Sequence, residues 1–201
     1  MSDFNKKELD ELSKIKGEIR GVVFYTDANY VLSKEGQSGL EKLENAVKEL
    51  GYPIDYKNPR RTDWYPFGLR AVSLILIKET FKWNDEEMNE MGWNAPNFSF
   101  IIKIFMKFFI SLEKIAKEAP HLWTEHYKNI GKLSTAKFDE EKRIMVLRLE
   151  GFKVHPIFCP YLAGYFTKVS SFGLKNQKPH CVETKCNFRG DSYHDFKITW
   201  D

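Results

Sequence analysis

The chain has 201 residues, a formal net charge of +3 and an aromatic content of 15%, and its acidic and basic residues are interspersed. A chain of this length can bury one complete core, and its balanced charge excludes the basic surface of a typical nucleic-acid-binding protein. Its three cysteines are too few for a disulfide-dense secreted scaffold, so we expect reduced thiols and a cytoplasmic protein.

The apolar stretches of the sequence do not predict a membrane protein. The first residues, Met-Ser-Asp-Phe-Asn-Lys-Lys, lack the apolar segment of a signal peptide. The longest apolar run, from Phe98 to Leu112, is shorter than the roughly 20 residues of a membrane span, and Lys103 and Lys107 interrupt it. We therefore expect no membrane span.

The first two thirds of the chain predict helices. Residues 1–16 are rich in charge, with leucines at helical spacing, and should form an arm or helix in front of a single domain over residues 17–201. A capping box begins a helix over residues 38–50, and Trp64-Tyr65-Pro66 opens a second, apolar helix that runs to Ile77. The longest helix is predicted over residues 97–118, with a proline to end it.

Beyond Gly131 the pattern changes to that of a sheet. Residues 133–138 and 143–150 predict two strands, and residues 155–172 predict a helix. Two more strand-forming runs lie within residues 180–200, on either side of Arg189-Gly190-Asp191. The predicted fold is α+β, a helical N-terminal layer packed on a four-stranded antiparallel sheet with the order β-β-α-β-β in its C-terminal half.

The last hairpin brings metal-binding residue types together. If its turn is centred on Gly190, residues whose numbers sum to 380 face each other, which pairs Cys186 with His194. Directly opposed side chains have Cβ atoms roughly 4.5–5.5 Å apart, and a thiolate and an imidazole at that distance can share one metal ion. The hairpin therefore predicts part of a metal site.

Two motifs of the C-terminal half resemble the 4-vinyl-reductase-like domain family. The first is Phe158-Cys-Pro-Tyr-Leu-Ala-Gly-Tyr-Phe, and the second is Val182-Glu-Thr-Lys-Cys-Asn-Phe-Arg-Gly-Asp followed by Ser-Tyr-His-Asp-Phe. The resemblance implies the fold shared by haem–nitric-oxide-binding domains and by subunits of the Golgi-tethering TRAPP complex, which is often dimeric.

The same resemblance implies a structural zinc ion as cofactor. Carried over onto this sequence, its ligands are Cys159, Glu183, Cys186 and His194, with histidine at the last position where the family has cysteine. On a regular strand Glu183 should point away from Cys186, three residues later. Either a bulge re-aims Glu183, or the fourth ligand is water or one of two other residues: His180 and Asp191. Cys181 is expected in the core.

We expect a non-catalytic small-molecule-binding or sensing domain, because no known catalytic motif is present. Aromatic residues of the helical half predict a pocket for a hydrophobic or aromatic ligand: Trp64, Tyr65, Trp93, Phe98, Phe105 and Phe109. The chain carries no effector module, so its partners would be a second copy in a homodimer and a separate effector protein.

Three alternatives remain at this point. The domain could be a protein-interaction scaffold like the TRAPP subunits, or an accessory protein or enzyme of tetrapyrrole metabolism. It could also be a haem-based gas sensor with His121 or His126 as the iron ligand, although the Tyr-x-Ser-x-Arg signature that holds haem propionates in gas sensors is absent.

Overall fold

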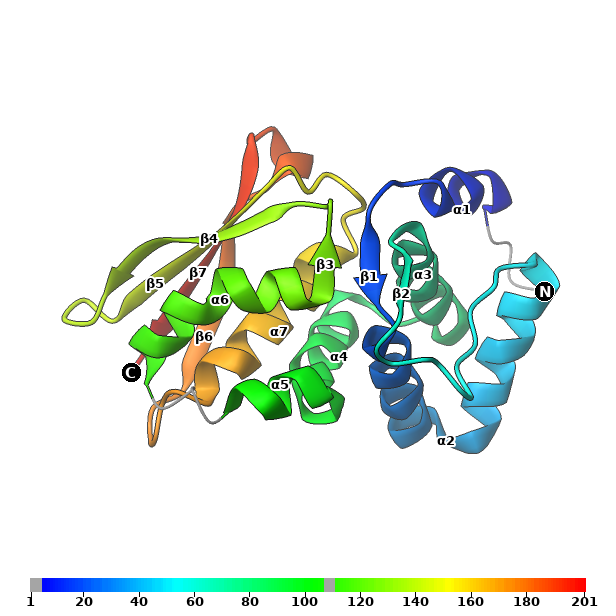
Figure 1. Ribbon diagram of the computed structural model, residues 1–201, viewed down its shortest axis with the longest axis horizontal. Helices are drawn as coiled ribbons and strands as arrows, with labels where there is room; N and C mark the ends of the chain where they lie inside the picture. The colour runs from blue at the N-terminus through cyan, green and yellow to red at the C-terminus, as the bar shows by residue number, and fades with distance from the viewer. Residues whose placement is uncertain (1–4, 107–110) are drawn as a thin grey trace.

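The computed structural model describes residues 5–106 and 111–201. Figure 1 shows a helical part at one end of the molecule and a twisted sheet at the other, with helices packed between them. The helices of the first part are α1 (Lys6–Ser13), α2 (Val22–Leu50), α3 (Gly68–Phe81), α4 (Asp85–Phe98) and α5 (Phe100–Phe105).

The C-terminal part is an antiparallel sheet with two helices on one face. It has four strands, as the sequence predicts, and their order in the sheet is β4-β5-β7-β6. Leu133, Leu147 and Phe196 are buried on the inner face, under the helices. The elements are α6 (Leu112–His126), β4 (Lys132–Asp139), β5 (Ile144–Glu150), α7 (Phe158–Ser171), β6 (Pro179–Lys185) and β7 (Tyr193–Trp200).

A second, small sheet was not predicted from the sequence. Its strands are β2 (Trp64–Pro66), β1 (Glu18–Arg20) and β3 (Tyr127–Lys128), in the order β2-β1-β3. The prediction that Trp64-Tyr65-Pro66 opens a helix is therefore wrong. Pro66 ends the edge strand β2, where a missing N–H costs no ladder hydrogen bond, and α3 begins two residues later.

The predicted helix over residues 97–118 is also wrong. Ser99 ends α4 in an extended conformation and its hydroxyl caps α5, while Ser111 caps α6 in the same way. Pro120 lies inside α6, which continues to His126. Apolar composition alone did not reveal these breaks. A serine caps a helix only where the backbone leaves helical geometry, and the sequence does not show where this happens.

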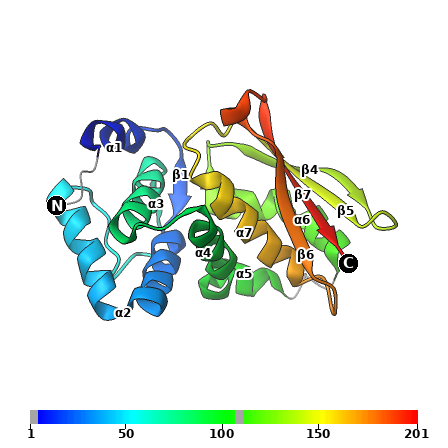
Figure 2. The same cartoon turned by 180° about the vertical axis from the view of Figure 1, so that it is seen from behind.

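Helices α4 and α7 cross at two glycines, and this crossing joins the two parts of the molecule (Figure 2). A Cβ atom built on Gly92 would lie 1.9 Å from the carbonyl oxygen of Tyr161, and one built on Gly164 would lie 1.9 Å from that of Asn89. No other residue type allows the two backbones to approach so closely. Gly164 therefore packs α7 against another helix, α4.

The helical part contains a fully buried ion pair. Arg70 on α3 contacts Asp27 on α2, and Ser73 donates a second hydrogen bond of 2.8 Å to the same carboxylate oxygen. Burial opposes the charge of Arg70, but Asp27 outweighs this effect and raises the pKa of the guanidinium. The pair therefore ties α2 to α3 through charge as well as through apolar packing.

The predicted N-terminal arm is a short helix held by apolar contacts. Helix α1 buries Leu9 and Leu12, and it packs on α3. None of the helices in residues 5–106 and 111–201 has the length and apolar composition needed to cross a membrane.

Candidate functional site

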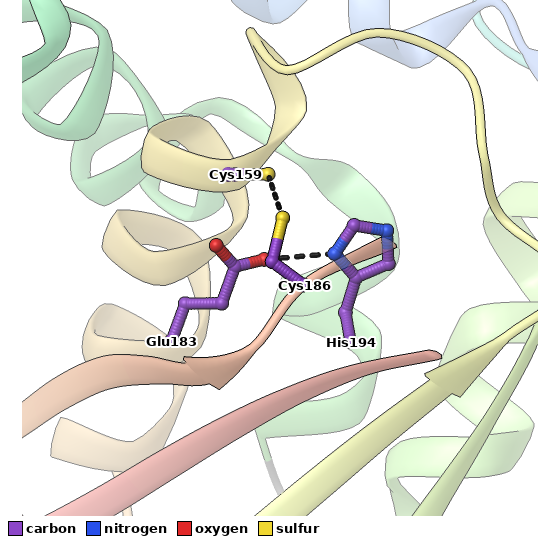
Figure 3. Close-up of side chains that lie close together, drawn as sticks. All are labelled: Cys159, Glu183, Cys186 and His194. Atoms are coloured by element: carbon purple, nitrogen blue, oxygen red, sulfur yellow. Dashed lines mark hydrogen bonds and ion pairs between the residues drawn. The ribbon is translucent and has the colours of Figure 1, made fainter. Parts of the chain in front are cut away.

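Four potential metal ligands come together where α7 meets the last hairpin. Cys159 lies in the first turn of α7, Glu183 near the end of β6, Cys186 just after β6, and His194 in β7. Figure 3 shows the four side chains pointing toward one point. One ligand atom from each residue lies within 4.8 Å of the ligand atoms of the other three.

A β-bulge places Glu183 in this cluster. Glu183 pairs with Phe196 and Lys185 pairs with Asp195, so one extra residue, Thr184, lies between them on β6. The extra residue reverses the side-chain alternation and turns Glu183 toward the same side as Cys186. The bulge was one of the predicted alternatives, but the predicted register of the hairpin is wrong by one residue along most of β6.

The turn after β6 is fixed by its own hydrogen bonds. The backbone N–H of Cys186 donates to the carboxylate of Asp191 at 2.8 Å, and the carbonyl of Cys186 accepts from the N–H groups of Arg189 and Asp191. Gly190 has a positive φ of 96°, which allows the chain to reverse. Asp191 therefore orients the backbone of Cys186 rather than joining the cluster as a ligand.

The cluster is held by short contacts. The sulfur atoms of Cys159 and Cys186 are 3.7 Å apart, and Nδ1 of His194 lies 2.8 Å from Oε1 of Glu183. Nε2 of His194 donates to the carbonyl oxygen of Phe152 at 2.9 Å. Metal-binding histidines commonly donate their second ring N–H to a backbone carbonyl. This bond therefore holds the ring of His194 in an orientation that suits metal binding through Nδ1.

The electrostatics of the cluster favour a cation. Burial, together with the neighbouring Glu183 and Cys186, raises the pKa of the Cys159 thiol well above its ordinary value. Burial alone would also raise the pKa of Glu183, but hydrogen bonds from His194 and Cys159 outweigh it and lower this pKa. Two thiols, a carboxylate and an imidazole form a donor set that suits a soft divalent metal ion.

The other residues considered as ligands lie outside the cluster. His180 is exposed on β6, and Cys181 is partly buried with its pKa raised to about 12 by burial. Cys181 packs against the core, which agrees with its predicted position.

His126, at the end of α6, is the second candidate. Its side chain is buried, and its Nδ1 lies 3.0 Å from the carbonyl oxygen of Leu122. Burial lowers the pKa of His126 to about 4, so the ring is neutral near pH 7. Sequence reasoning treated this helix as surface-like. The spacing of Ile115, Ala119, Leu122 and His126 could have shown that the histidine continues the apolar face.

Two internal cavities adjoin His126. The sheet-side cavity, between α6, α7 and the sheet, has a volume of about 30 Å³. The helix-side cavity, between α2, α4 and α7, has a volume of about 20 Å³. His126, Tyr127 and Tyr165 line both cavities and form the partition between them. No lysine or arginine is among the lining residues of either cavity.

None of the predicted pocket residues that the structure describes lines either of the two cavities beside His126. Trp64 lies on β2 beneath Arg20 and Lys128, whereas Trp93 lies on α4 near Lys168. The ring of Phe105 contacts His121, which is largely exposed. The three others are distributed as follows: Tyr65 on β2, Phe98 at the end of α4, and Phe109 outside the described residues.

Comparison with known proteins identifies the fold. No family model and no curated protein matches the chain. The structure is similar to H-NOX domains. An H-NOX protein from S. oneidensis in the Fe(II)NO ligation state gives a TM-score of 0.68 at 13% identity, over 91% of this chain and 99% of that one. An oxygen-binding H-NOX domain related to soluble guanylate cyclases gives a TM-score of 0.60 at 13% identity, over 91% of this chain and 95% of that one.

A third H-NOX protein, from K. algicida and described as Fe(II) unliganded, gives a TM-score of 0.64 at 12% identity, over 91% of this chain and 97% of that one. The predicted α+β fold, with a helical N-terminal layer and a C-terminal sheet, is confirmed. At these identities the likeness shows the fold alone. The S. oneidensis protein is described with Fe(II)NO and the guanylate-cyclase-related domain with oxygen, and both ligands belong to those proteins.

The same neighbours correct two predictions. The resemblance to the 4-vinyl-reductase-like family is wrong, because the similar solved structures are H-NOX domains and no family model supports the resemblance. The prediction of structural zinc as the cofactor is wrong as well, because the neighbours are described with iron and haem. Short sequence motifs around a hairpin do not distinguish families that share a fold.

Proposed function

We propose that this chain is a small-molecule sensor domain that binds its ligand in the core beside His126 and catalyses no reaction. The observation that carries the proposal is the position of His126. A neutral imidazole with one unused ring nitrogen lies between two cavities in the apolar core. Pockets that combine apolar walls with a few polar groups are typical of ligand sites.

The cavities limit the size of the ligand. A cavity of roughly 10–15 Å³ holds one water molecule on this measure, so about 30 Å³ and about 20 Å³ accommodate only a molecule of a few atoms. We infer a gas-sized or similarly small ligand rather than the larger aromatic molecule that the sequence suggested.

Haem-based gas sensing is the second candidate, favoured by the H-NOX neighbours and by His126 on α6. The residues present do not fit haem in this arrangement. Both cavities are far below the roughly 300–1,000 Å³ of ligand pockets, and neither has a cationic side chain to pair with haem propionates. His121, the other predicted iron ligand, is largely exposed beside Glu118 and Glu125.

We also propose that the four-donor cluster of Cys159, Glu183, Cys186 and His194 binds a soft divalent metal ion. Three observations support this assignment: the types of donor atom, the short contact between the two sulfur atoms, and the hydrogen bond from His194 to a backbone carbonyl. We propose further that the whole chain from residue 17, with α1 as its arm, acts as one domain. It would report to a second copy or to a separate effector protein.

Xenon binding tests the proposed core site. Xenon is apolar and enters small dry cavities, so we expect a saturable ¹²⁹Xe NMR shift with the wild-type protein. Ala119→Leu fills the sheet-side cavity, whose wall includes Ala119, and should remove the part of the shift that arises from this cavity. Lys117→Leu, an exposed position on the same helix, is the matched control. If the wild-type protein shows no xenon binding, the core site is excluded.

Addition of haem distinguishes the two candidates. We expect no Soret band shift with the wild-type protein, because neither cavity beside His126 admits the macrocycle. A stoichiometric Soret band that His126→Leu removes would instead establish haem binding through His126. A band that only His121→Leu removes would show that the iron ligand is His121, on the exposed side of α6.

A further inference from the structure

We propose that the ligand of the His126 site is a neutral molecule of roughly two to four heavy atoms whose O–H, N–H or S–H group donates a hydrogen bond to Nε2 of His126. This inference rests on the proposed function and names the chemical class of the ligand. Each step follows from the surroundings of the ring.

The tautomer of His126 is fixed by the backbone. The carbonyl oxygen of Leu122 can only accept a hydrogen bond, and it lies 3.0 Å from Nδ1. Nδ1 therefore carries the proton of the neutral ring, and Nε2 keeps its lone pair. The ring presents a hydrogen-bond acceptor to the ligand.

This acceptor has no hydrogen-bond donor among the residues that the structure describes. The hydroxyl of Thr26, which also lines the helix-side cavity, donates to the carbonyl of Val23 at 2.8 Å. The hydroxyl of Ser99 accepts from the N–H of Ile102, and no hydrogen bond joins it or the hydroxyls of Tyr127, Tyr161 and Tyr165 to His126. Because an acceptor that no protein group satisfies gains a hydrogen bond from a ligand with a donor, such a ligand is selected over one without a donor.

The ligand is neutral because the site offers nothing to a charge. All lining side chains of the two cavities are apolar or uncharged, and burial keeps His126 itself deprotonated near pH 7. An ion entering this space would lose its hydration without gaining a counter-charge. The size limit follows from the cavity volumes of about 30 Å³ and about 20 Å³.

A pair of matched probes tests the inference. 2-Propanol and acetone share one carbon–oxygen skeleton, but only 2-propanol has a donor. We expect 2-propanol to bind the wild-type protein about tenfold more tightly than acetone, measured by NMR titration. We also expect it to shift the Nε2 signal of His126 in a long-range ¹H–¹⁵N spectrum while Nδ1 stays protonated. His126→Phe should bind the two probes equally, and His121→Phe should keep the preference.

The outcomes separate this inference from the proposed function. Equal affinity for the two probes in the wild-type protein overturns the donor requirement, whereas xenon binding in the same sample would leave the core site in place. An Nε2 signal that is already shifted by a hydrogen bond before any probe is added also overturns the inference. If His126→Phe does not fold, the Nε2 signal of the wild-type protein decides alone.

Discussion

Nε2 of His194 lies 2.9 Å from the carbonyl oxygen of Phe152, and this hydrogen bond connects the four-donor cluster to the aromatic core. The ring of Phe152 packs edge-on against Trp123, with ring centres 5.6 Å apart. Trp123 stacks on Tyr127, and both line the sheet-side cavity. A continuous series of contacts through Phe152 and Trp123 therefore connects the cluster to the cavity.

The raised pKa of Cys159 predicts how metal binding depends on pH. Burial and the neighbouring Glu183 and Cys186 keep this thiol protonated near neutral pH, so it loses a proton when it binds a metal ion as a thiolate. We expect the affinity for cobalt(II), followed by its thiolate charge-transfer absorbance, to increase between about pH 6 and pH 8, because both values lie below the pKa of the thiol.

Two cysteine variants complete that experiment. Cys186→Ser removes a ligand and should abolish the charge-transfer band. Cys181→Ser changes a cysteine outside the cluster and should leave the band unchanged. A band that depends on Cys181, or an affinity that does not change with pH, would show that the cluster is not the binding site.

His126 makes the stability of the protein depend on pH. Its pKa is about 4 in the folded protein and about 6.5 in the unfolded chain, so the unfolded chain takes up the proton first as the pH falls. The stability contributed by the neutral ring is complete above about pH 6.5 and is lost toward pH 4. At about 1.4 kcal/mol per pH unit, the loss is on the order of 3 kcal/mol.

Urea unfolding at pH 7 and pH 4.5 measures this loss. The free energy of unfolding should fall less for His126→Leu than for the wild-type protein, because the variant has no ring to protonate. His121→Leu is the control, since His121 is largely exposed, and its decrease should match that of the wild type. Identical decreases in wild type and His126→Leu would contradict the buried, neutral state of His126.

The buried pair of Asp27 and Arg70 should tolerate joint replacement better than single replacement. Arg70→Met leaves a carboxylate in the core without its partner, at a cost of about 3–5 kcal/mol in the free energy of unfolding. Asp27→Leu with Arg70→Met removes both charges and should recover most of this loss. Lys82→Met, which breaks an exposed pair with Glu79, should cost less than about 1 kcal/mol. A double variant as unstable as the single one would contradict this account.

The crossing of α4 and α7 predicts a large effect of one methyl group. In Gly164→Ala the new Cβ would meet the carbonyl of Asn89 at 1.9 Å, so the helices must separate. We expect a loss of about 2–3 kcal/mol in urea unfolding. Ser171→Ala on the same helix removes only a hydroxyl bonded to the carbonyl of Lys168, and should be nearly neutral. A stable Gly164→Ala protein would show that the helices do not cross at this distance.

The sheet half was predictable from the sequence because its pattern is local. The alternation of Met145, Leu147 and Leu149 specifies which face of β5 is buried, and the structure buries all three. The break at Ser99 was hidden by the apolar composition on both sides of it. The strand at Trp64 was not predictable, because its partner lies far along the chain. Trp64 pairs with Arg20 across β1 and β2.

The four-donor cluster was predicted residue by residue, and the structure brings all four side chains together. The apolar spacing along α6 could have shown that His126 is buried, whereas the cavities around it depend on how α6 meets α7 and the sheet. Tyr165, which shares the partition with His126, comes from α7 and could be placed there only once the tertiary fold was known.

The bulge at Thr184 gives the cluster an unusual dependence on chain length. Thr184 is held at this position by a 3.2 Å hydrogen bond from its hydroxyl to the carbonyl of Asp195. Substitution of Thr184 keeps the residue count, and with it the direction of Glu183. Deletion of Thr184 would restore the regular alternation and turn Glu183 outward. In related chains the cluster can therefore disappear through loss of one codon while every donor residue is retained.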